Sequence, residues 1–194
     1  MDAYFERGKA YASKSNHDLA ILDFSKVIEI DPAFIDAYWL RGKEFADKCS
    51  YDRAISDFTK VIEVNPNADA YYNRGRAYAG KGSLDQAIED FTKGIEIDDT
   101  WYTYYGYCDR GNAYVKKGNL EQAIFDFTKA IESSPNEFDA HQYRARAYFA
   151  LKDYDKCWED IYAEENLDGE IDAEFLAELE KESGRVMKKA QSND

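Results

Sequence analysis

The sequence predicts an all-α fold made of repeated helical hairpins, and three observations carry this prediction. Blocks of sequence recur along the 194-residue chain at nearly constant intervals. Inside each block the apolar residues follow the i, i+3, i+4 spacing of amphipathic helices. All three prolines fall at one position of the repeat, where each would stop a helix.

The repeat is marked by an Arg-Gly pair. The pair occurs at residues 7–8, 41–42, 74–75 and 110–111, with Arg144-Ala145 as a degenerate fifth copy, so successive copies lie 34, 33, 36 and 34 residues apart. A second block follows 12 residues later in each copy and reads AILDF, AISDF, AIEDF, AIFDF and CWEDI. These marks divide residues 1–171 into five copies: 1–34, 35–67, 68–103, 104–137 and 138–171.

Each copy predicts two helices joined by a turn. In the first copy the apolar stripes indicate helices near residues 2–14 and 17–30, with a turn at Ser15-Asn16 and a stop at Pro32. Glycine inside a helix costs about 1 kcal/mol relative to alanine. We therefore expect Gly8 and its equivalents to serve close packing, with Gly8 lying against Ala20 and Phe24 filling the flanking space.

One further amphipathic helix is predicted for residues 172–190, followed by a tail at 191–194. Its apolar face comprises Ile171, Phe175, Leu176 and Leu179. Three basic residues, Arg185 among them, would complement the dipole at its C-terminal end. Glu182 replaces the aromatic residue on which another copy would stack, so we expect this helix to cap the array. No such cap precedes Met1, so we expect either a fragment of a longer protein or an end covered by a partner.

The five copies resemble the tetratricopeptide repeat, and the resemblance covers nearly the whole chain. Copy four matches all seven positions of the family pattern: Tyr107, Gly111, Tyr114, Ala123, Phe127, Ala130 and Pro135. Copy five departs most, with Cys157 and Glu164 at positions that are otherwise small or apolar. The resemblance implies a right-handed α-solenoid that binds a peptide or protein segment in a concave groove.

Charge and composition narrow the function. The chain carries 39 acidic against 25 basic residues, a net charge of −14, which disfavours binding to nucleic acid or anionic membranes. It shows no signal-peptide pattern and no apolar stretch of about 18 residues, so we expect a cytoplasmic protein. The three cysteines are far apart, and Cys157 is expected to be a small packing residue.

No motif indicates catalysis, a metal or a cofactor. The sequence has no glycine-rich phosphate loop, no paired metal-ligand motif and no nucleophile elbow. Its two histidines fall in different copies: His17 is expected to be a solvated turn residue, and His141 a packing residue. We therefore expect a binding protein that is not an enzyme and holds no cofactor.

Two charges recur without exception, an arginine at position 7 and an aspartate at position 23 of every copy. They could form a ladder of recognition charges, or ion pairs that hold the hairpins together. We favour ion pairs, because the two residues always occur together and a guanidinium can bond a carboxylate at both oxygens. The expected pairs are Arg7–Asp23, Arg41–Asp57, Arg74–Asp90, Arg110–Asp126 and Arg144–Asp160.

The resemblance places positions 2, 5, 9 and 12 of each first helix on the concave surface. The groove residues expected from this are Phe5, Lys9, Trp39, Lys43, Tyr72, Arg76, Tyr105, Asn112 and Arg146. They suggest a basic centre with aromatic platforms and an acidic ligand; alternatively, the basic residues pair with nearby carboxylates. The clamp that co-chaperone members use for a C-terminal carboxylate is absent, because only Asn73 matches it.

An aromatic cluster accompanies the two extra residues before the fourth copy. We expect at least two of Trp101, Tyr102, Tyr104 and Tyr105 to be exposed, with Tyr105 beside Cys108 and Asn112 on the groove wall. The alternative is that the cluster packs in the core. The leading functional hypothesis is therefore a protein-interaction module, and the alternative is a scaffold that self-associates through its uncapped N-terminal face.

Overall fold

The computed structural model describes residues 1–97, 102–137, 139–167, 169 and 171–187. Within these ranges the chain forms eleven α-helices and no strand, so the all-α prediction is confirmed. None of the described helices is long and apolar enough to cross a membrane. The helices are α1 (Asp2–Ala12), α2 (His17–Ile30), α3 (Ile35–Asp47), α4 (Tyr51–Val64), α5 (Ala68–Lys81), α6 (Leu84–Ile97), α7 (Tyr102–Lys117), α8 (Leu120–Ser133), α9 (Asp139–Ala150), α10 (Tyr154–Asn166) and α11 (Ala173–Ser183).

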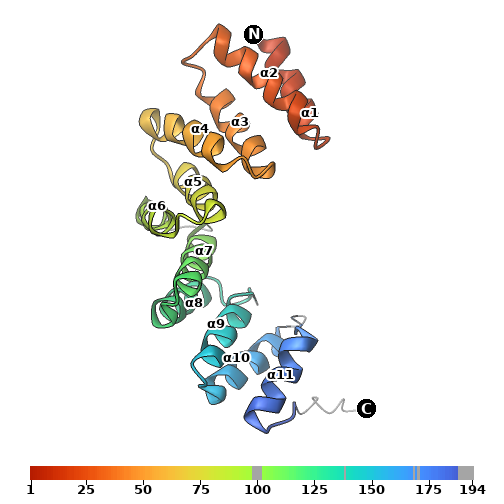
Figure 1. Cartoon of the computed structure of the whole chain (residues 1–194), viewed down its shortest axis with the longest axis vertical. Helices are drawn as coiled ribbons and strands as arrows, with labels where there is room; N and C mark the ends of the chain where they lie inside the picture. Colours follow the sequence, from red (N-terminus) through yellow and green to blue (C-terminus); the bar gives the residue numbers. More distant parts are fainter. Residues whose placement is uncertain (98–101, 138, 168, 170, 188–194) are drawn as a thin grey trace.

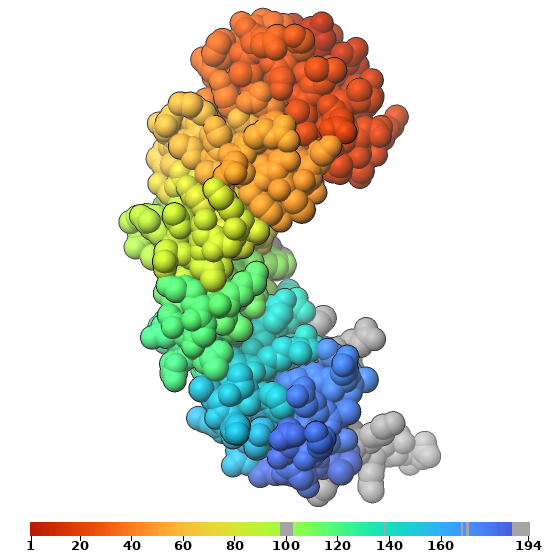
Figure 2. Space-filling view, viewed as in Figure 1, coloured from red at the N-terminus to blue at the C-terminus, as the bar shows by residue number. Residues whose placement is uncertain are grey.

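The helices pair into five antiparallel hairpins that stack one on the next. Each helix packs mainly against its neighbours in the chain, and the hairpins follow an arc (Figure 1). The space-filling view shows the same elongated, curved body (Figure 2). The first helices of successive hairpins, α1, α3, α5, α7 and α9, also contact one another. They therefore line the inner side of the arc, where successive hairpins lie closest together.

A glycine and a phenylalanine hold each hairpin closed. A Cβ placed on Gly8 would lie 2.7 Å from the ring of Phe24, and the rings opposite Gly42, Gly75 and Gly111 leave equally little room. Phe24 itself is fully buried. The nearest atoms to Gly8 thus belong to Phe24, whereas the sequence predicted that Gly8 lies against Ala20. Close approach is confirmed as the reason for the glycine, and an aromatic ring provides it.

All five Arg–Asp pairs form in the structure. In every hairpin Nε and Nη2 of the arginine donate hydrogen bonds of 2.6–3.0 Å to the two oxygens of the aspartate. Each aspartate is at most 4% exposed. In hairpins two to five Nη1 also donates to a hydroxyl of the preceding hairpin: Ser25, Thr59, Thr92 and Thr128 in turn. One guanidinium therefore joins two helices of its own hairpin and ties them to the hairpin before it.

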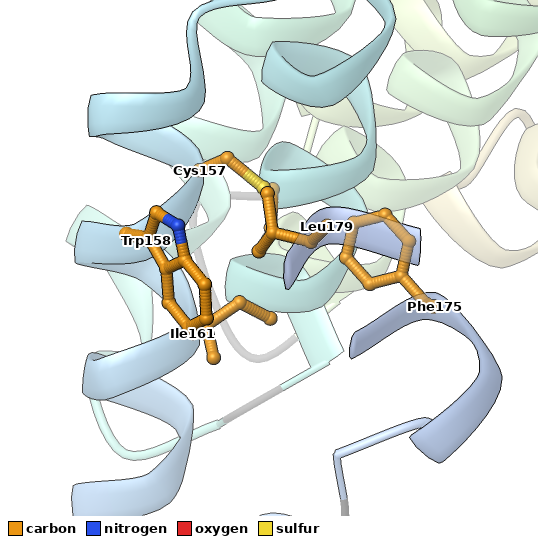
Figure 3. Close-up of a cluster of buried hydrophobic side chains, with 6 residues drawn as sticks. Cys157, Trp158, Ile161, Phe175 and Leu179 are labelled. Carbon is orange, nitrogen blue, oxygen red and sulfur yellow. The ribbon is translucent and has the colours of Figure 1, made fainter. Parts of the chain in front are cut away.

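The C-terminal helix α11 packs on the last hairpin. Phe175 and Leu179 of α11 pack against Cys157, Trp158 and Ile161 of α10 (Figure 3). The Asp172 side chain caps the helix by accepting hydrogen bonds from two backbone amides of its first turn. The helix is shorter than the predicted 172–190, because it ends at Ser183 and Gly184 follows with a φ of +70°.

The basic end of α11 also differs from the prediction. Arg185 lies beyond the helix, and its guanidinium pairs with Asp155 of α10 instead of complementing the helix dipole. The other two basic residues, Lys188 and Lys189, lie outside the described residues. Cys157 is fully buried among the apolar side chains, which confirms its expected packing role.

Replacing Arg110 by alanine tests whether the Arg–Asp pairs support the fold. The change strands Asp126, which is 1% exposed, so we expect a loss of about 3–5 kcal/mol in the free energy of unfolding. Urea denaturation measures it. The control is Lys129→Ala, which breaks the exposed Lys129–Glu132 pair and should cost less than about 1 kcal/mol. Equal losses in the two variants would show that the buried pair is not structural.

Candidate functional site

The nine residues predicted to form the concave groove all lie on the first helices α1, α3, α5, α7 and α9. The groove residues fall into three classes of exposure. Lys9, Lys43, Arg76, Tyr105 and Arg146 are exposed; Phe5, Trp39 and Asn112 are partly buried; Tyr72 is buried. Eight of the nine are therefore at least partly exposed, and that they share one groove stays a prediction.

Three of the four basic groove residues carry intramolecular carboxylate partners. Lys9 pairs with Glu6 at 2.7 Å, and Arg76 and Arg146 pair with Asp109 and Asp172 at 2.6 Å. Lys43 is the exception: among the described residues no carboxylate lies within 4.0 Å of its Nζ, which sits 5.9 Å from the Trp39 ring centroid. Three of the four predicted basic groove residues are thus compensated within the chain, and Lys43 is the one of the four that is not.

A shallow cavity of about 310 Å³, here called the central cavity, lies between α5 and α7. Its polar lining comprises Arg76, Asp109, Asn112 and Lys116, and its base includes Phe91. Arg76 Nε donates to Asp109 Oδ2 at 2.6 Å. Burial nevertheless raises the pKa of Asp109 above its ordinary value, against the opposing effect of the Arg76 charge. The cavity therefore offers both donors and acceptors beside an apolar floor.

Two aromatic side chains at the N-terminal half of the groove are partly buried. Phe5 contacts Phe34 edge-on at a centroid distance of 4.9 Å. Trp39 meets the ring of Phe58 at 5.6 Å. The Phe5 ring also lies 6.0 Å from the core ring of Phe24, so each of the two rings contacts one core aromatic and keeps part of its surface exposed. Their role as platforms for a ligand stays a prediction.

Tyr72 is not a groove platform, which corrects the prediction. Its ring is 4% exposed and lies between α6 and α7. Two glycines make room for it, because a Cβ on Gly94 would lie 2.5 Å from Tyr72 Cε1 and one on Gly106 would lie 2.6 Å from the same atom. The side chain therefore joins the third hairpin to the fourth inside the core.

The aromatic cluster before the fourth hairpin divides between core and surface. Tyr104 is 3% exposed and packs with Cys108, Ala130 and Ala140, so this residue lies in the core, as the alternative predicted. Tyr105 is 36% exposed and meets the Tyr104 ring edge-on at 5.1 Å. Trp101 and the side chain of Tyr102 lie outside the described residues, so the expectation that two of the four are exposed stays a prediction.

The thiols show no sign of nucleophilic activation. Burial raises the pKa of Cys108 to about 12 and that of Cys157 to about 12, which keeps both protonated near neutral pH. His141 is buried, as expected, and its Nδ1 lies 3.2 Å from Asp160 Oδ1. His17 differs from the prediction, because it is partly buried and its Nδ1 lies 2.8 Å from Glu44 Oε2.

Two buried glutamates were not identified from the sequence as members of a polar site. Glu44 is 7% exposed in α3 and faces His17; Glu164 is fully buried in α10. Gln142 Nε2 donates to Glu164 Oε1 at 3.1 Å, while Oε2 has no hydrogen-bond partner in the described part of the chain. Burial, only partly offset by the Gln142 hydrogen bond, raises the pKa of Glu164. Each glutamate occupies a position that is small or apolar in the other copies, and this departure was the available signal.

Comparison with protein families gives one consistent result. Tetratricopeptide repeat models match residues 2–34, 35–67, 68–100, 104–137 and 127–159. No curated protein sequence matches the chain.

Solved structures show the same architecture. A crystal structure of MamA is 23% identical, with a TM-score of 0.78 over 83% of this chain and 94% of MamA. PilF of Pseudomonas aeruginosa is 20% identical, with a TM-score of 0.76 over 93% of this chain and 82% of PilF. YrrB, described as a TPR protein with an unusual peptide-binding site, is 19% identical, with a TM-score of 0.70 over 84% of each chain. At these identities the likeness concerns the fold.

Gly94→Ala tests the packing of Tyr72. Alanine favours a helix by about 1 kcal/mol over glycine, but the new methyl would press on a ring that Gly106 confines from the other side. We expect a net loss of about 1–2 kcal/mol in the free energy of unfolding, measured by thermal or urea denaturation. In a Tyr72→Ala background the same change should be stabilising. A stabilising effect of Gly94→Ala in the wild-type background would contradict the close packing of Tyr72 against Gly94.

Glu164→Gln tests the buried carboxyl through its pH dependence. Because the folded-state pKa of Glu164 is raised, its favourable contribution is present below the unfolded pKa and is lost as pH rises through the folded pKa. Glutamine has the same shape and does not ionise. Near pH 4 the variant and the wild type should have the same melting temperature. At pH 7 the variant should melt at a higher temperature, and its free energy of unfolding should exceed that of the wild type by about 1–3 kcal/mol. A difference in melting temperature that stays constant from pH 4 to pH 7 would argue against a raised pKa of Glu164.

Proposed function

The chain belongs to the tetratricopeptide repeat family of protein-interaction modules, and on this basis we propose that it binds an extended peptide or protein segment along its concave groove. The supporting observation is the central cavity between α5 and α7, where donors and acceptors surround an apolar floor. Such a mixture suits a peptide, whose backbone needs hydrogen bonds and whose side chains need contact area.

The central cavity would hold the peptide backbone. Within the described part of the chain no side-chain hydrogen bond engages the amide of Asn112, so both its N–H and its C=O can serve a ligand. The Arg76–Asp109 pair next to it is itself partly exposed, with 52% and 27% of the two side chains accessible. A peptide amide lying here would meet a fixed row of polar groups, which orients it at little entropic cost.

The N-terminal half of the groove would supply an anchor for one acidic side chain. None of the described carboxylates pairs with Lys43, and its ammonium lies beside the partly exposed ring of Trp39. An acidic residue next to an apolar one would place its carboxylate at Lys43 and its neighbour on the indole. The acidic character of the ligand is therefore proposed for this one contact and not for the whole groove.

Self-association through α1 is the second candidate function, and Arg7 favours it. Its side chain is 55% exposed, whereas the equivalent arginines of hairpins two to five are 14–19% exposed. Tyr4 and Met1 on the same face are 39% and 41% exposed. A second copy of the chain could cover this surface. Sedimentation at several concentrations separates the candidates, since a strict monomer excludes self-association.

Lys43→Glu tests the proposed groove. A linear peptide selected from a random library with the full chain serves as the probe, and fluorescence anisotropy measures its dissociation constant. We expect a peptide with an acidic anchor to bind the variant at least tenfold more weakly, a loss of about 1.4 kcal/mol. Asn112→Ala should also weaken binding.

The matched control is Lys60→Glu, which makes the same charge change on α4, outside the groove. It should bind the peptide like the wild type. If Lys43→Glu and Lys60→Glu weaken binding equally, the effect comes from the net charge of the chain and not from the groove. If Lys43→Glu and Asn112→Ala both leave the dissociation constant unchanged, the peptide binds elsewhere.

A further inference from the structure

Glu44 departs from the repeat in a way that neither packing nor the groove explains. Its position in the other four copies is alanine: Ala10, Ala77, Ala113 and Ala147. In hairpins three to five that alanine is 1–2% exposed. Glu44 is 7% exposed, so α3 buries a carboxylate where the array otherwise buries a methyl group. A charge in such a place needs a partner of opposite charge or a metal ion.

Two further ligand-type side chains lie beside Glu44. His17, at the start of α2, comes from the preceding hairpin, and its Nδ1 is 2.8 Å from Glu44 Oε2. Asp47 follows Glu44 by three residues on α3, which places it one turn along the same helix face. One ligand atom from each of the three side chains lies within 4.8 Å of the other two. The cluster therefore spans the junction of the first two hairpins.

We propose that His17, Glu44 and Asp47 form a binding site for a divalent transition-metal ion, with Zn²⁺ as the best match. Zn²⁺ binds imidazole nitrogen and carboxylate oxygen at about 2.0–2.2 Å, which sets neighbouring donor atoms about 3.4 Å apart in a tetrahedral site. The His17–Glu44 distance needs only a small extension for an ion to replace the hydrogen between them. Asp47 is exposed and free to turn inward, and water would complete the tetrahedron.

The surroundings admit an ion and suit this class of metal. His17 lines an open hollow of about 240 Å³, and Asp47 is exposed, so solvent reaches the cluster at two of its three side chains. Lys48 lines the same hollow, and Asp18 engages its ammonium at 2.5 Å, so its charge is compensated. Asp47 lies at the C-terminal end of α3, where the helix dipole favours a cation. An imidazole with two carboxylates favours Zn²⁺ over Mg²⁺ and Ca²⁺, which prefer six or more oxygen ligands.

Such an ion would join two hairpins. His17 belongs to the first hairpin and both carboxylates belong to the second, so bound metal would stabilise the stacking at the N-terminal end of the array. Because binding to the folded state alone raises stability with the logarithm of metal concentration, the melting temperature should rise with added Zn²⁺.

The test is titration of the full chain with Zn²⁺ alone, followed by isothermal calorimetry and by the nitrogen resonances of the histidine rings. The sequence contains only two histidines, so the metal should shift the His17 signals and leave those of His141 in place. Cys49→Ser serves as the background, because Cys49 is an exposed thiol that could bind zinc by itself. We expect one ion per chain and a melting temperature that rises with Zn²⁺.

Three variants decide the result. Glu44→Ala restores the alanine of the other copies and should fold, and Asp47→Asn changes an exposed side chain; each should weaken Zn²⁺ binding at least tenfold. Glu89→Gln, an exposed acidic residue on α6, is the matched control and should bind like the wild type. Zn²⁺ binding that survives both Glu44→Ala and Asp47→Asn, that shifts no His17 signal, or that is equally weakened by Glu89→Gln would overturn the site.

Discussion

The structure depends on a guanidinium that carries out two tasks at once. In hairpins two to five the arginine closes its own hairpin by bonding both oxygens of a buried aspartate, and its remaining nitrogen reaches a hydroxyl of the hairpin before. A buried aspartate without this partner would be a desolvated charge, so the two residues are required together. The same contact sets hairpin geometry and hairpin spacing, which is why the period of the sequence and the period of the structure agree.

This arrangement also shapes the groove. The first helices are tied to the preceding hairpin by these arginines, and three of the four basic residues predicted for the groove meet a carboxylate: Lys9 within α1, Arg76 on α7 and Arg146 at the N-cap of α11. In a chain with a net charge of −14, basic side chains find acidic partners readily. An unpaired cation such as Lys43 is therefore more informative about a ligand than the number of basic residues in the groove.

The recurring part of the structure could be predicted from the sequence, and the departures could not. Helices, turns and Arg–Asp pairs repeat in five copies, so each copy supports the interpretation of the others. Tyr72 shows the limit: its helix position was assigned correctly, but its burial depends on space left by Gly94 and Gly106 in two other helices. Tyr104 is similar, since contacts with α8 and α9 bury it. Helical spacing predicts on which face of its helix a side chain lies. It does not predict how much space the residues of the facing helices leave for that side chain.

Departures from the repeat nonetheless have a physical pattern. Gly94 and Gly106 each replace a larger residue of the other copies, and both accommodate the ring of Tyr72, so the two departures belong to one packing unit. Glu44 replaces a buried alanine and meets a histidine of the preceding hairpin at 2.8 Å. A buried polar residue in an otherwise apolar column is costly for the fold alone. Where such a residue also meets other ligand-type groups from a neighbouring hairpin, the cost is best explained by binding, and the junction of the first two hairpins is where this chain combines both conditions.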